Sequence, residues 1–254
     1  MMDQTGKVAI ITGATGGIGF AVAKRLGQDG YTVVLNGIED EQGAKRVEEL
    51  KAEGISAEYY GFDVTKEDMV DKNIKAIGEK YGKIDVLVNN AGGLGGRSRF
   101  EDMTTDFYRF VMALNLDSAF FASRAAIPYL KKSDNPSIIN YTSIAGWNAG
   151  GPGAGIYGTS KAGVHALTRA LAKDLAEYGI RVNAVSPGTI DTDFHKQIKS
   201  TKPEVFASWA NNILLGRLGQ PEDVASVVAF LASKDAAFLT AETLQITGGQ
   251  GLGI

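Results

Sequence analysis

The chain has 254 residues, with 26 lysines and arginines against 29 aspartates and glutamates, so its formal net charge is −3. This balance excludes a general nucleic-acid binder, which would carry a basic surplus on one face. The chain has no cysteine and two histidines, which excludes disulfides and thiolate chemistry and argues against a zinc site. We expect no metal site. No uninterrupted apolar run reaches the roughly 18 residues of a membrane span, and Met1–Lys7 lacks a signal-peptide pattern. We therefore expect a cytoplasmic protein with no membrane partner.

Short apolar runs alternate with longer amphipathic stretches along the whole chain. Strands are predicted at residues 8–11, 33–35, 58–62, 86–88, 137–141, 180–185 and 243–246, and helices at residues 17–28, 41–52, 68–80, 105–114, 118–131, 157–178 and 221–231. This alternation is typical of βαβ crossovers and predicts an α/β fold with a doubly wound parallel sheet covered on both faces. No linker or internal repeat interrupts it, so we expect a single domain over residues 1–254.

A glycine-rich segment, Thr12–Gly19, follows the first strand and opens the first helix. Its glycines would let backbone N–H groups approach a pyrophosphate at the helix N-terminus. Its spacing, Gly13-x-x-x-Gly17-x-Gly19, differs from the standard dinucleotide fingerprint, and no Gly-Lys-Ser/Thr follows, which excludes a P-loop. A merely tight turn would also explain these glycines. The predicted cofactor contacts in this segment are Gly13, Thr15, Gly16, Ile18 and Gly19.

Tyr157 and Lys161 are spaced i and i+4 at the start of a long predicted helix, so their side chains share one face. An ammonium beside the phenol is expected to lower the pKa of Tyr157 from about 10 and so make it a general acid/base. Ser143 follows the fifth strand and could hydrogen-bond a substrate carbonyl oxygen. Asn115 lies between two helical stretches, where an unpaired backbone carbonyl could hold a water.

The alternative to a catalytic pair is a solvated helix face with an anchoring aromatic side chain. Two further motifs argue against that alternative. Asn89–Gly92 follows the fourth strand and Pro187-Gly188 follows the sixth, so both lie at the carboxyl ends of strands, where open α/β sheets bind ligands. We therefore expect an active site there.

These motifs together resemble those of the short-chain dehydrogenase/reductase family, from Lys7 to the C-terminus. The matching segments are Thr12–Gly19, Asp63-Val64, Asn89–Gly92, Asn115, Ser143, Tyr157-x-x-x-Lys161 and Pro187-Gly188. The resemblance implies a Rossmann-like fold in one dinucleotide-binding and catalytic domain. It also implies nicotinamide-dependent interconversion of an alcohol and a ketone or aldehyde, usually in a homotetramer.

The resemblance also implies roles for individual residues. Asp63 and Val64 would line the adenine pocket, and Asn90 would lie on the adenosine side. Lys161 would contact the nicotinamide ribose, and Asn115 would carry the water that links Lys161 to solvent. Ile190 and Thr192 would contact the nicotinamide end, and the remaining predicted cofactor contacts are Gly92, Tyr157, Pro187 and Gly188. The predicted catalytic residues are Ser143, Tyr157, Lys161 and Asn115.

The segment after the second strand, Asn36–Asp40, bears on the choice between NAD and NADP. NADP needs a cation for its 2′-phosphate, whereas the two acids of this segment would repel one. Gly16 stands where NADP-preferring relatives often carry a cation, and the next cations are Lys45 and Arg46. The aspartate usual in NAD-dependent members is itself absent. We expect NAD(H) as the preferred cofactor, with contacts at Gly37, Ile38 and Glu39.

Residues 188–216 form a connection longer than usual between a strand and a helix, and we expect a substrate lid there. The alternative is a pair of short surface helices. With Arg97 and Arg99, the cations of this lid favour a small polar substrate, such as a sugar- or uronate-derived keto acid of carbohydrate metabolism. Two alternatives are an NADPH-dependent 3-oxoacyl thioester reductase and a noncatalytic nucleotide-sensing protein. The lid residues that bear on substrate choice are His195, Lys196, Lys199, Lys202 and Trp209.

Other side chains border these motifs. Trp147 and Asn148 lie close enough to Ser143 to line the pocket or to pack beside it, and His165 is expected to pack or to cap. The helices predicted at residues 105–131 and 157–178 carry apolar residues on more than one face. One face can cover the sheet and another can pack on a neighbouring subunit, which agrees with a homotetramer.

Overall fold

A sheet of seven parallel strands forms the centre of the molecule, and the computed structural model describes residues 6–252. The strands are β1 (Lys7–Ile11), β2 (Tyr31–Gly37), β3 (Ala57–Gly61), β4 (Val86–Asn89), β5 (Ser137–Tyr141), β6 (Arg181–Pro187) and β7 (Thr243–Ile246). Their order is β3-β2-β1-β4-β5-β6-β7, so the direction of winding reverses between β1 and β4. This confirms the predicted doubly wound, Rossmann-like α/β fold, in which ligands bind at the carboxyl ends of the strands beside the reversal.

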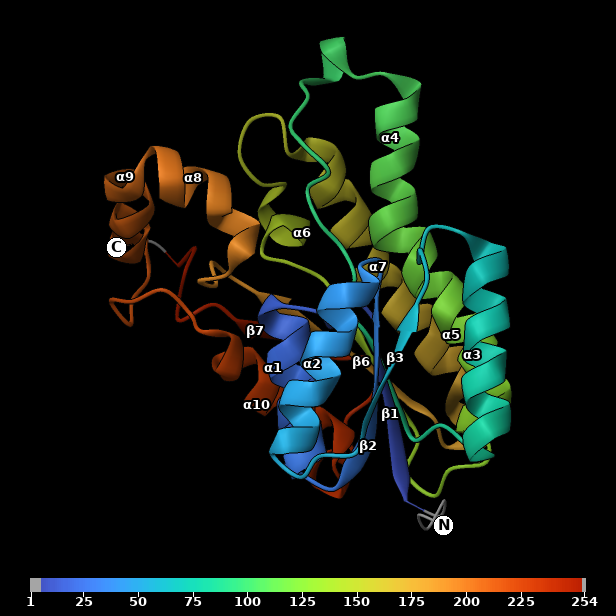
Figure 1. The fold of residues 1–254 in the computed structure, drawn as a ribbon. Helices are drawn as coiled ribbons and strands as arrows, with labels where there is room; N and C mark the ends of the chain where they lie inside the picture. The colour runs from blue at the N-terminus through green and yellow to red at the C-terminus, as the bar shows by residue number, and fades with distance from the viewer. Residues whose placement is uncertain (1–5, 253–254) are drawn as a thin grey trace.

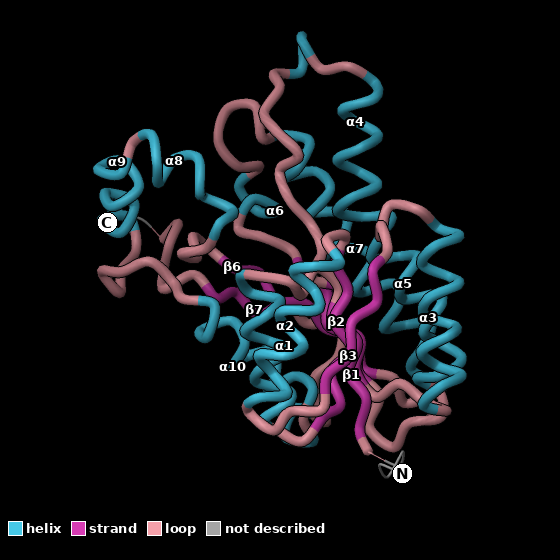
Figure 2. The backbone as a smooth tube through the Cα atoms, in the orientation of Figure 1, coloured by secondary structure: helices cyan, strands magenta, loops and turns pink. Residues whose placement is uncertain are grey.

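Helices cover both faces of the sheet (Figures 1 and 2). The helices on one face are α1 (Gly17–Gln28), α2 (Asp40–Ala52) and α10 (Pro221–Ala232), and those on the other are α3 (Glu67–Tyr81), α5 (Ser118–Leu130) and α7 (Gly155–Leu175). The remaining helices are α4 (Thr105–Met112), α6 (Ala145–Asn148), α8 (Lys196–Thr201) and α9 (Pro203–Ser208). Figure 1 shows these four beyond the carboxyl ends of the strands.

The central strands read as continuous apolar runs because both of their faces are buried. In β1, Ala9 and Ile11 pack into the core beneath α1 and α10, whereas Val8 and Ile10 pack into the core beneath α3 and α5. All four side chains are at most 1% exposed. Successive side chains of a strand point to opposite faces, so one short segment supplies both cores.

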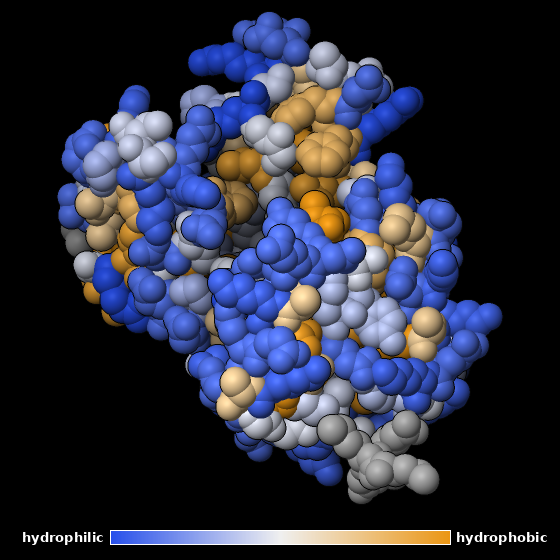
Figure 3. Space-filling model, in the orientation of Figure 1, coloured by the Kyte–Doolittle hydropathy of each residue, from blue (hydrophilic) through white to orange (hydrophobic). Residues whose placement is uncertain are grey.

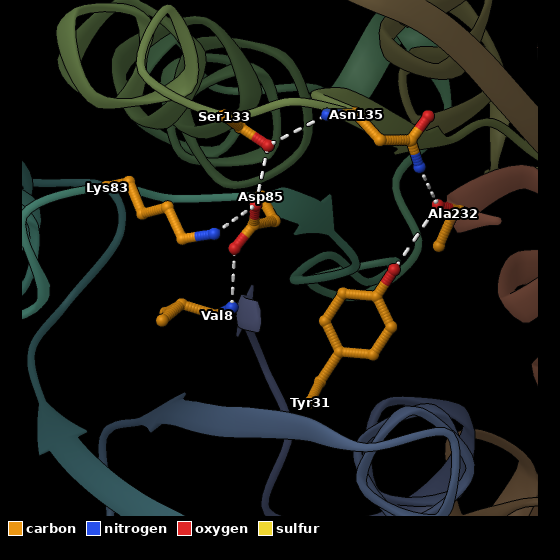
Figure 4. A network of polar contacts seen from close by, with 7 residues as sticks. All are labelled: Val8, Tyr31, Lys83, Asp85, Ser133, Asn135 and Ala232. Carbon is orange, nitrogen blue, oxygen red and sulfur yellow. Dashed lines mark hydrogen bonds and ion pairs between the residues drawn. The ribbon is translucent and has the colours of Figure 1, made fainter. Parts of the chain in front are cut away.

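A polar network fixes the amino ends of the strands, on the edge opposite the carboxyl ends (Figure 4). The buried carboxylate of Asp85, which precedes β4, accepts hydrogen bonds from the Val8 amide at 2.8 Å and the Ser133 hydroxyl at 2.5 Å. Lys83 pairs with the same carboxylate at 3.1 Å. Buried charge is tolerated only where it is hydrogen-bonded and paired, so this network ties β1 to β4 and to the end of α5.

The same network holds the C-terminal end of α10. The Ala232 carbonyl accepts hydrogen bonds from Asn135 Nδ2 at 3.0 Å and from the Tyr31 hydroxyl at 3.3 Å. The buried guanidinium of Arg181 donates to the Leu231 carbonyl at 2.8 Å. The last carbonyls of α10 have no partner within the helix, and the Arg181 guanidinium, the Asn135 amide and the Tyr31 hydroxyl thus supply the missing hydrogen bonds.

The differences from the predicted elements lie in the loops. The predicted helices at residues 105–114 and 118–131 are one continuous helical run, joined by a π-helical turn over Ala113–Asp117. The four-residue helix α6 is absent from the prediction. Residues 188–216 contain the short helices α8 and α9. Whether this segment acts as a substrate lid stays a prediction. Residues 1–5 and 253–254 lie outside the described residues. The prediction that Met1–Lys7 is not part of a signal peptide therefore falls mostly outside them as well.

One helical run passes a test for membrane crossing by length and composition. It is Thr105–Leu130, with 26 residues and a mean hydropathy of 1.2 in its most apolar window. Such a helix is weak evidence, because a core helix of a soluble protein passes the same test. In this run α5 packs against β4, and its Arg124 pairs with Glu67 and Asp71 of α3. The absence of a membrane partner and the cytoplasmic location therefore stay predictions.

Candidate active site

A cavity of about 620 Å³ lies at the carboxyl ends of the strands, where Figure 3 shows the surface hollowed beside the α8–α9 segment. Its volume is in the range of small-molecule sites. The turn after β1, the loops after β4, β5 and β6, and the start of α7 all contribute to it. The predicted site residues that line it are Gly13, Gly16, Ile18, Gly19, Asn90, Gly92, Ser143, Tyr157, Lys161, Pro187, Gly188, Ile190 and Thr192.

The glycine turn after β1 makes a cradle that side chains would fill. Gly13 has φ +62°, and a Cβ there would lie 2.9 Å from the Ala91 Cα. A Cβ on Gly19 would lie 2.4 Å from the Gly13 carbonyl oxygen. The Asn90 amide fixes the turn by donating to the carbonyls of Thr12 and Gly13, both at 2.9 Å. The N-terminus of α1, with no acidic residue in its first turn, is thereby open to an anion, which fits the pyrophosphate of a dinucleotide.

The remaining predicted cofactor contacts gather along the neighbouring strand ends, outside the cavity lining. They are Thr15, Gly37, Ile38, Glu39, Asp63 and Val64. A Cβ on Gly37 would lie 2.5 Å from the Thr15 Cγ2, so the end of β2 adjoins the glycine turn. Ile38 is 76% exposed, and the Asp63 carboxylate accepts hydrogen bonds from the amide and hydroxyl of Thr65. Contact of these residues with the adenosine half of a cofactor stays a prediction.

The ammonium of Lys161 is buried at the centre of the site. Its side chain belongs to α7, is 3% exposed, and donates a hydrogen bond to the Tyr141 carbonyl at 2.9 Å. Burial lowers the pKa of Lys161 to about 8, so the group stays mostly protonated at neutral pH. A Cβ on Gly92 would lie 2.9 Å from the Lys161 Nζ and 2.7 Å from the Asn115 Oδ1. Glycine at this position therefore lets the loop after β4 pass between the two side chains.

Asn115 lies within the π-helical turn between α4 and α5, as expected for a break between two helical stretches. Its amide nitrogen donates to the carbonyls of Gly93 at 2.8 Å and Val111 at 3.0 Å, and its oxygen accepts from the Gly93 amide at 3.0 Å. Asn115 thus holds the loop that borders Lys161, although it does not line the cavity itself. Turns of this kind are frequent at functional sites. The water predicted beside Asn115 stays a prediction.

The pKa of Tyr157 moves in the direction opposite to the expected one. The side chain is half-buried, and the loss of water around the phenol raises its pKa, while a hydrogen bond with Ser143 acts the other way. The Lys161 Nζ lies 5.9 Å from the Tyr157 ring centroid, and it donates to the Tyr141 carbonyl. The expected overall lowering of the pKa of Tyr157 is therefore wrong for this structure, because the effect of burial on the phenol is the largest one and raises the pKa. The phenol stays protonated at neutral pH.

The structure shows which of the other candidate side chains line the cavity, a question that the sequence left open. Arg97, Asn148, His195 and Trp209 line the cavity, whereas Arg99 does not. Trp147 packs outside it, donating from Nε1 to the Ser186 hydroxyl at 3.1 Å and meeting the His165 ring at 4.9 Å between centroids. His165 Nδ1 lies 2.8 Å from the Thr243 hydroxyl, which confirms its packing role.

Some cavity residues were missed by sequence reasoning. Phe194, which meets the Tyr157 ring at 6.3 Å between centroids, follows the predicted contact Thr192 closely enough to have been found. Asn212 and Gln250 also line the cavity. Asn212 lies within residues 188–216, the segment expected to be a lid, but no motif marks it individually. Gln250 reaches the site through the loop after β7, and no signal in the local sequence marks it.

The comparisons with known proteins agree with this geometry. A family model described as enoyl-(acyl carrier protein) reductase matches residues 13–250. The chain is 39% identical over 248 residues to the 3-oxoacyl-[acyl-carrier-protein] reductase FabG of Thermotoga maritima, covering 98% of this chain and 99% of the relative.

Solved structures match the chain over nearly its whole length. The aldohexose dehydrogenase of Thermoplasma acidophilum has a TM-score of 0.88 at 36% identity, covering 99% of this chain and 96% of that one. A structure described as an NADH-dependent reductase responsible for alginate metabolism has a TM-score of 0.87 at 36% identity, covering 98% and 99%. These similarities confirm the family resemblance seen in the sequence.

Replacement of the half-buried phenol tests the assignment of Tyr157 as the proton donor. We expect Tyr157→Phe to lower kcat by about 10²–10⁴-fold, the usual contribution of general acid catalysis, while the Kd for NADH, measured by fluorescence, changes little. Tyr178→Phe is the matched control, because Tyr178 is 43% exposed and lies outside the cavity lining. A Tyr157→Phe enzyme that keeps most of its activity would remove Tyr157 from this role.

Proposed function

The chain belongs to the short-chain dehydrogenase/reductase family, and from this premise we propose that it transfers a hydride between NAD(H) and the carbonyl or alcohol group of a small polar substrate. One observation carries the proposal: Ser143, Tyr157 and Lys161 line the same cavity as the glycine turn after β1. A noncatalytic nucleotide sensor would not need a buried ammonium, a phenol and a hydroxyl around one space.

Each of these side chains has a task in the proposed reaction. When bound, the nicotinamide cofactor supplies the hydride for reduction or accepts it in oxidation. The Ser143 hydroxyl, whose oxygen accepts from the Ala145 amide at 3.1 Å, orients the carbonyl oxygen of the substrate. The Tyr157 hydroxyl donates its proton to that oxygen as the C–H bond forms, and the Lys161 ammonium stabilises the phenolate that remains. Solvent then returns a proton to the phenolate by way of the Lys161 ammonium and the water predicted beside Asn115, which completes the cycle.

The charges around the end of β2 support NAD(H) as the preferred cofactor. Glu39 and Asp40 are exposed there, and Gly16 offers no cation. Arg46 reaches the turn, donating from Nε to the Thr15 carbonyl at 3.0 Å, but its guanidinium also pairs with Glu49 at 2.6 Å. A cation with these partners is poorly placed to neutralise a 2′-phosphate. The FabG relatives and the structure of a ketoreductase with NADPH keep NADP(H) as the second candidate.

Binding measurements decide between the two cofactors. We expect a Kd for NADH at least about tenfold below that for NADPH, equivalent to about 1.4 kcal/mol, because the acids after β2 repel the extra phosphate. Titration of protein fluorescence with each reduced cofactor measures this ratio directly. Glu39→Lys is the informative variant, because it should improve NADPH binding. A lower Kd for NADPH in the wild type would overturn the assignment.

For the substrate, we propose a compact polar carbonyl compound, such as a sugar- or uronate-derived keto acid. Four polar side chains of the cavity wall support this choice: Arg97, Asn148, His195 and Asn212. The wall also includes apolar side chains, among them Leu94, Phe194 and Trp209, but Gly150 and Gly151 add no side chain to them. The aldohexose dehydrogenase and the alginate-related reductase are also compatible with it. The second candidate is reduction of a 3-oxoacyl thioester, which the names of the most similar curated relatives favour.

A substrate screen separates these candidates. NADH oxidation is followed with keto-uronates, neutral ketoses and acetoacetyl thioesters, and the screen is repeated with NADPH. We expect the highest kcat/KM with a keto-uronate, because its polar groups match the cavity walls. A preference for the thioester of more than about tenfold in kcat/KM, or about 1.4 kcal/mol of transition-state binding, would replace our proposal with the second candidate.

We also propose a homotetramer. Tyr108 and Phe110 of α4 and Phe120 of α5 are between 42% and 48% exposed, and Figure 3 shows apolar side chains gathered over this end of the molecule. Large apolar side chains left on one face commonly pack on a second subunit. Light scattering at micromolar concentration should report a tetramer that Phe110→Glu weakens, whereas a wild type that stays monomeric would contradict the proposal.

A further inference from the structure

One cationic side chain and one titratable side chain, from separate loops, line the cavity beside the proposed catalytic residues. Arg97 belongs to the loop after β4, and His195 precedes α8 in the connection after β6. We propose that Arg97 and His195 together bind a carboxylate of the substrate and thereby select short keto acids over neutral sugars. This inference rests on the proposed function. Arg99, two residues beyond Arg97, does not line the cavity.

Aromatic rings position His195. Its ring centroid lies 5.0 Å from that of Phe194, 5.6 Å from that of Phe206 and 5.2 Å from that of Trp209. Within the described part of the chain, no hydrogen bond involves either ring nitrogen of His195. The imidazole is therefore held by its faces and edges, and its nitrogens are free to meet a ligand in the cavity.

Backbone contacts position Arg97. Its Nη1 donates to the Pro152 carbonyl at 2.9 Å, and the next residue, Ser98, donates from its amide to the Gly153 carbonyl at 3.0 Å. A Cβ on Gly153 would lie 3.1 Å from the Arg97 Cβ, so the two loops are in close contact. One of the five N–H donors of the guanidinium is engaged in this way, and the other donors can make a charge-assisted hydrogen bond to a carboxylate.

The charged groups around Arg97 and His195 do not already neutralise Arg97, so an anion can bind there. Lys199 hydrogen-bonds to Asp191 and also lies 5.2 Å from the Phe206 ring centroid, so it is already paired. Arg97 forms no ion pair with any described residue. Asp193 is exposed, lines the same cavity, and works against an anion. The summed charge of Arg97, Asp193 and His195 is therefore zero while His195 is neutral and positive once His195 is protonated.

The protonation of His195 couples substrate binding to pH. Burial lowers its pKa, the neighbouring charges of Lys199 and Arg97 lower it further, and Asp191 raises it. The free enzyme therefore holds His195 mainly neutral at pH 7. A bound carboxylate favours the protonated ring, so the enzyme takes up a proton as the substrate binds, and affinity rises as pH falls toward the range in which His195 titrates.

The spacing suits a short substrate. The Tyr157 and Phe194 ring centroids lie 6.3 Å apart, and Phe194 lies 5.0 Å from His195. The proton donor and the proposed carboxylate site are thus separated by one aromatic ring. A short hydroxylated chain can place its carbonyl at Tyr157 and its carboxylate at His195. A neutral ketose of equal length has no charged group that Arg97 and a protonated His195 could bind.

Matched substrates and variants test the carboxylate site. The probes are 5-ketogluconate and fructose, two six-carbon ketones of which only the first carries a carboxylate. We expect Arg97→Met and His195→Phe each to raise KM for the keto acid roughly tenfold or more, with little change for fructose. Asp193→Asn should lower KM for the keto acid, and Arg99→Met, the control, should leave both values unchanged.

The pH dependence distinguishes recognition by His195 from a structural role. The keto-acid KM of the wild type should fall from pH 8 to pH 6, while the fructose KM stays flat, and His195→Phe should remove this slope while keeping an aromatic ring in place. Equal effects of Arg97→Met and His195→Phe on both substrates would overturn the carboxylate site.

Calorimetry with gluconate on the NADH complex gives a readout that needs no turnover. Binding that weakens in Arg97→Met and His195→Phe supports the site even if thioesters are the better substrates, in which case only the proposed substrate class fails. Reduction of keto acids with a selectivity unchanged in both variants overturns the site and leaves the proposed function intact. A wild type that neither binds gluconate nor reduces 5-ketogluconate overturns both.

Discussion

The buried ammonium of Lys161 is the constraint on which the rest of the site depends. A charge taken out of water is costly unless hydrogen bonds replace the lost solvent, and the Tyr141 carbonyl at the end of β5 supplies one. The loop after β4 must pass beside the same group, and a Cβ at residue 92 would lie 2.9 Å from the Lys161 Nζ and 2.7 Å from the Asn115 Oδ1. The π-helical turn then brings Asn115 to hold that loop through Gly93. One buried cation thus explains features of β5, α7, the β4 loop and the α4–α5 junction.

Burial also shifts the pKa values of Lys161 and Tyr157 in opposite directions, which suits each group to a different role. It lowers the pKa of Lys161 to about 8 and raises the pKa of Tyr157. A phenol that stays protonated at neutral pH suits a proton donor for carbonyl reduction, and a nearby ammonium can stabilise the phenolate once the proton has left. The hydrogen bond with Ser143 opposes the effect of burial on Tyr157. The same hydroxyl that orients the substrate therefore also eases the release of the proton.

Much of this arrangement is readable from the sequence, because it follows from local patterns. The buried strands and the spacing of Tyr157 and Lys161 gave the sheet and the shared helix face. The π-helical turn could not be predicted, since apolar periodicity marks a break without giving its geometry. The sequence predicts that the pKa of Tyr157 is lowered, and this prediction is wrong. The i, i+4 spacing identifies Lys161 as a neighbour of Tyr157, but it carries no information on how deeply the phenol is buried. Asn212 reaches the cavity only through tertiary packing, and Trp147 turned away from it for the same reason.

The central claim is that the buried Lys161 ammonium stabilises the phenolate that remains at Tyr157 once its proton has left. The direct test is the pH profile of kcat/KM for alcohol oxidation, which requires the phenolate, in the wild type and in Lys161→Met. Methionine fills the space of the lysine stem without its charge, and thermal unfolding and cofactor binding verify that the variant is folded. Without the ammonium to stabilise the phenolate, kcat/KM should fall and the alkaline rise in activity should move to higher pH. An active Lys161→Met enzyme with an unshifted profile would contradict the account.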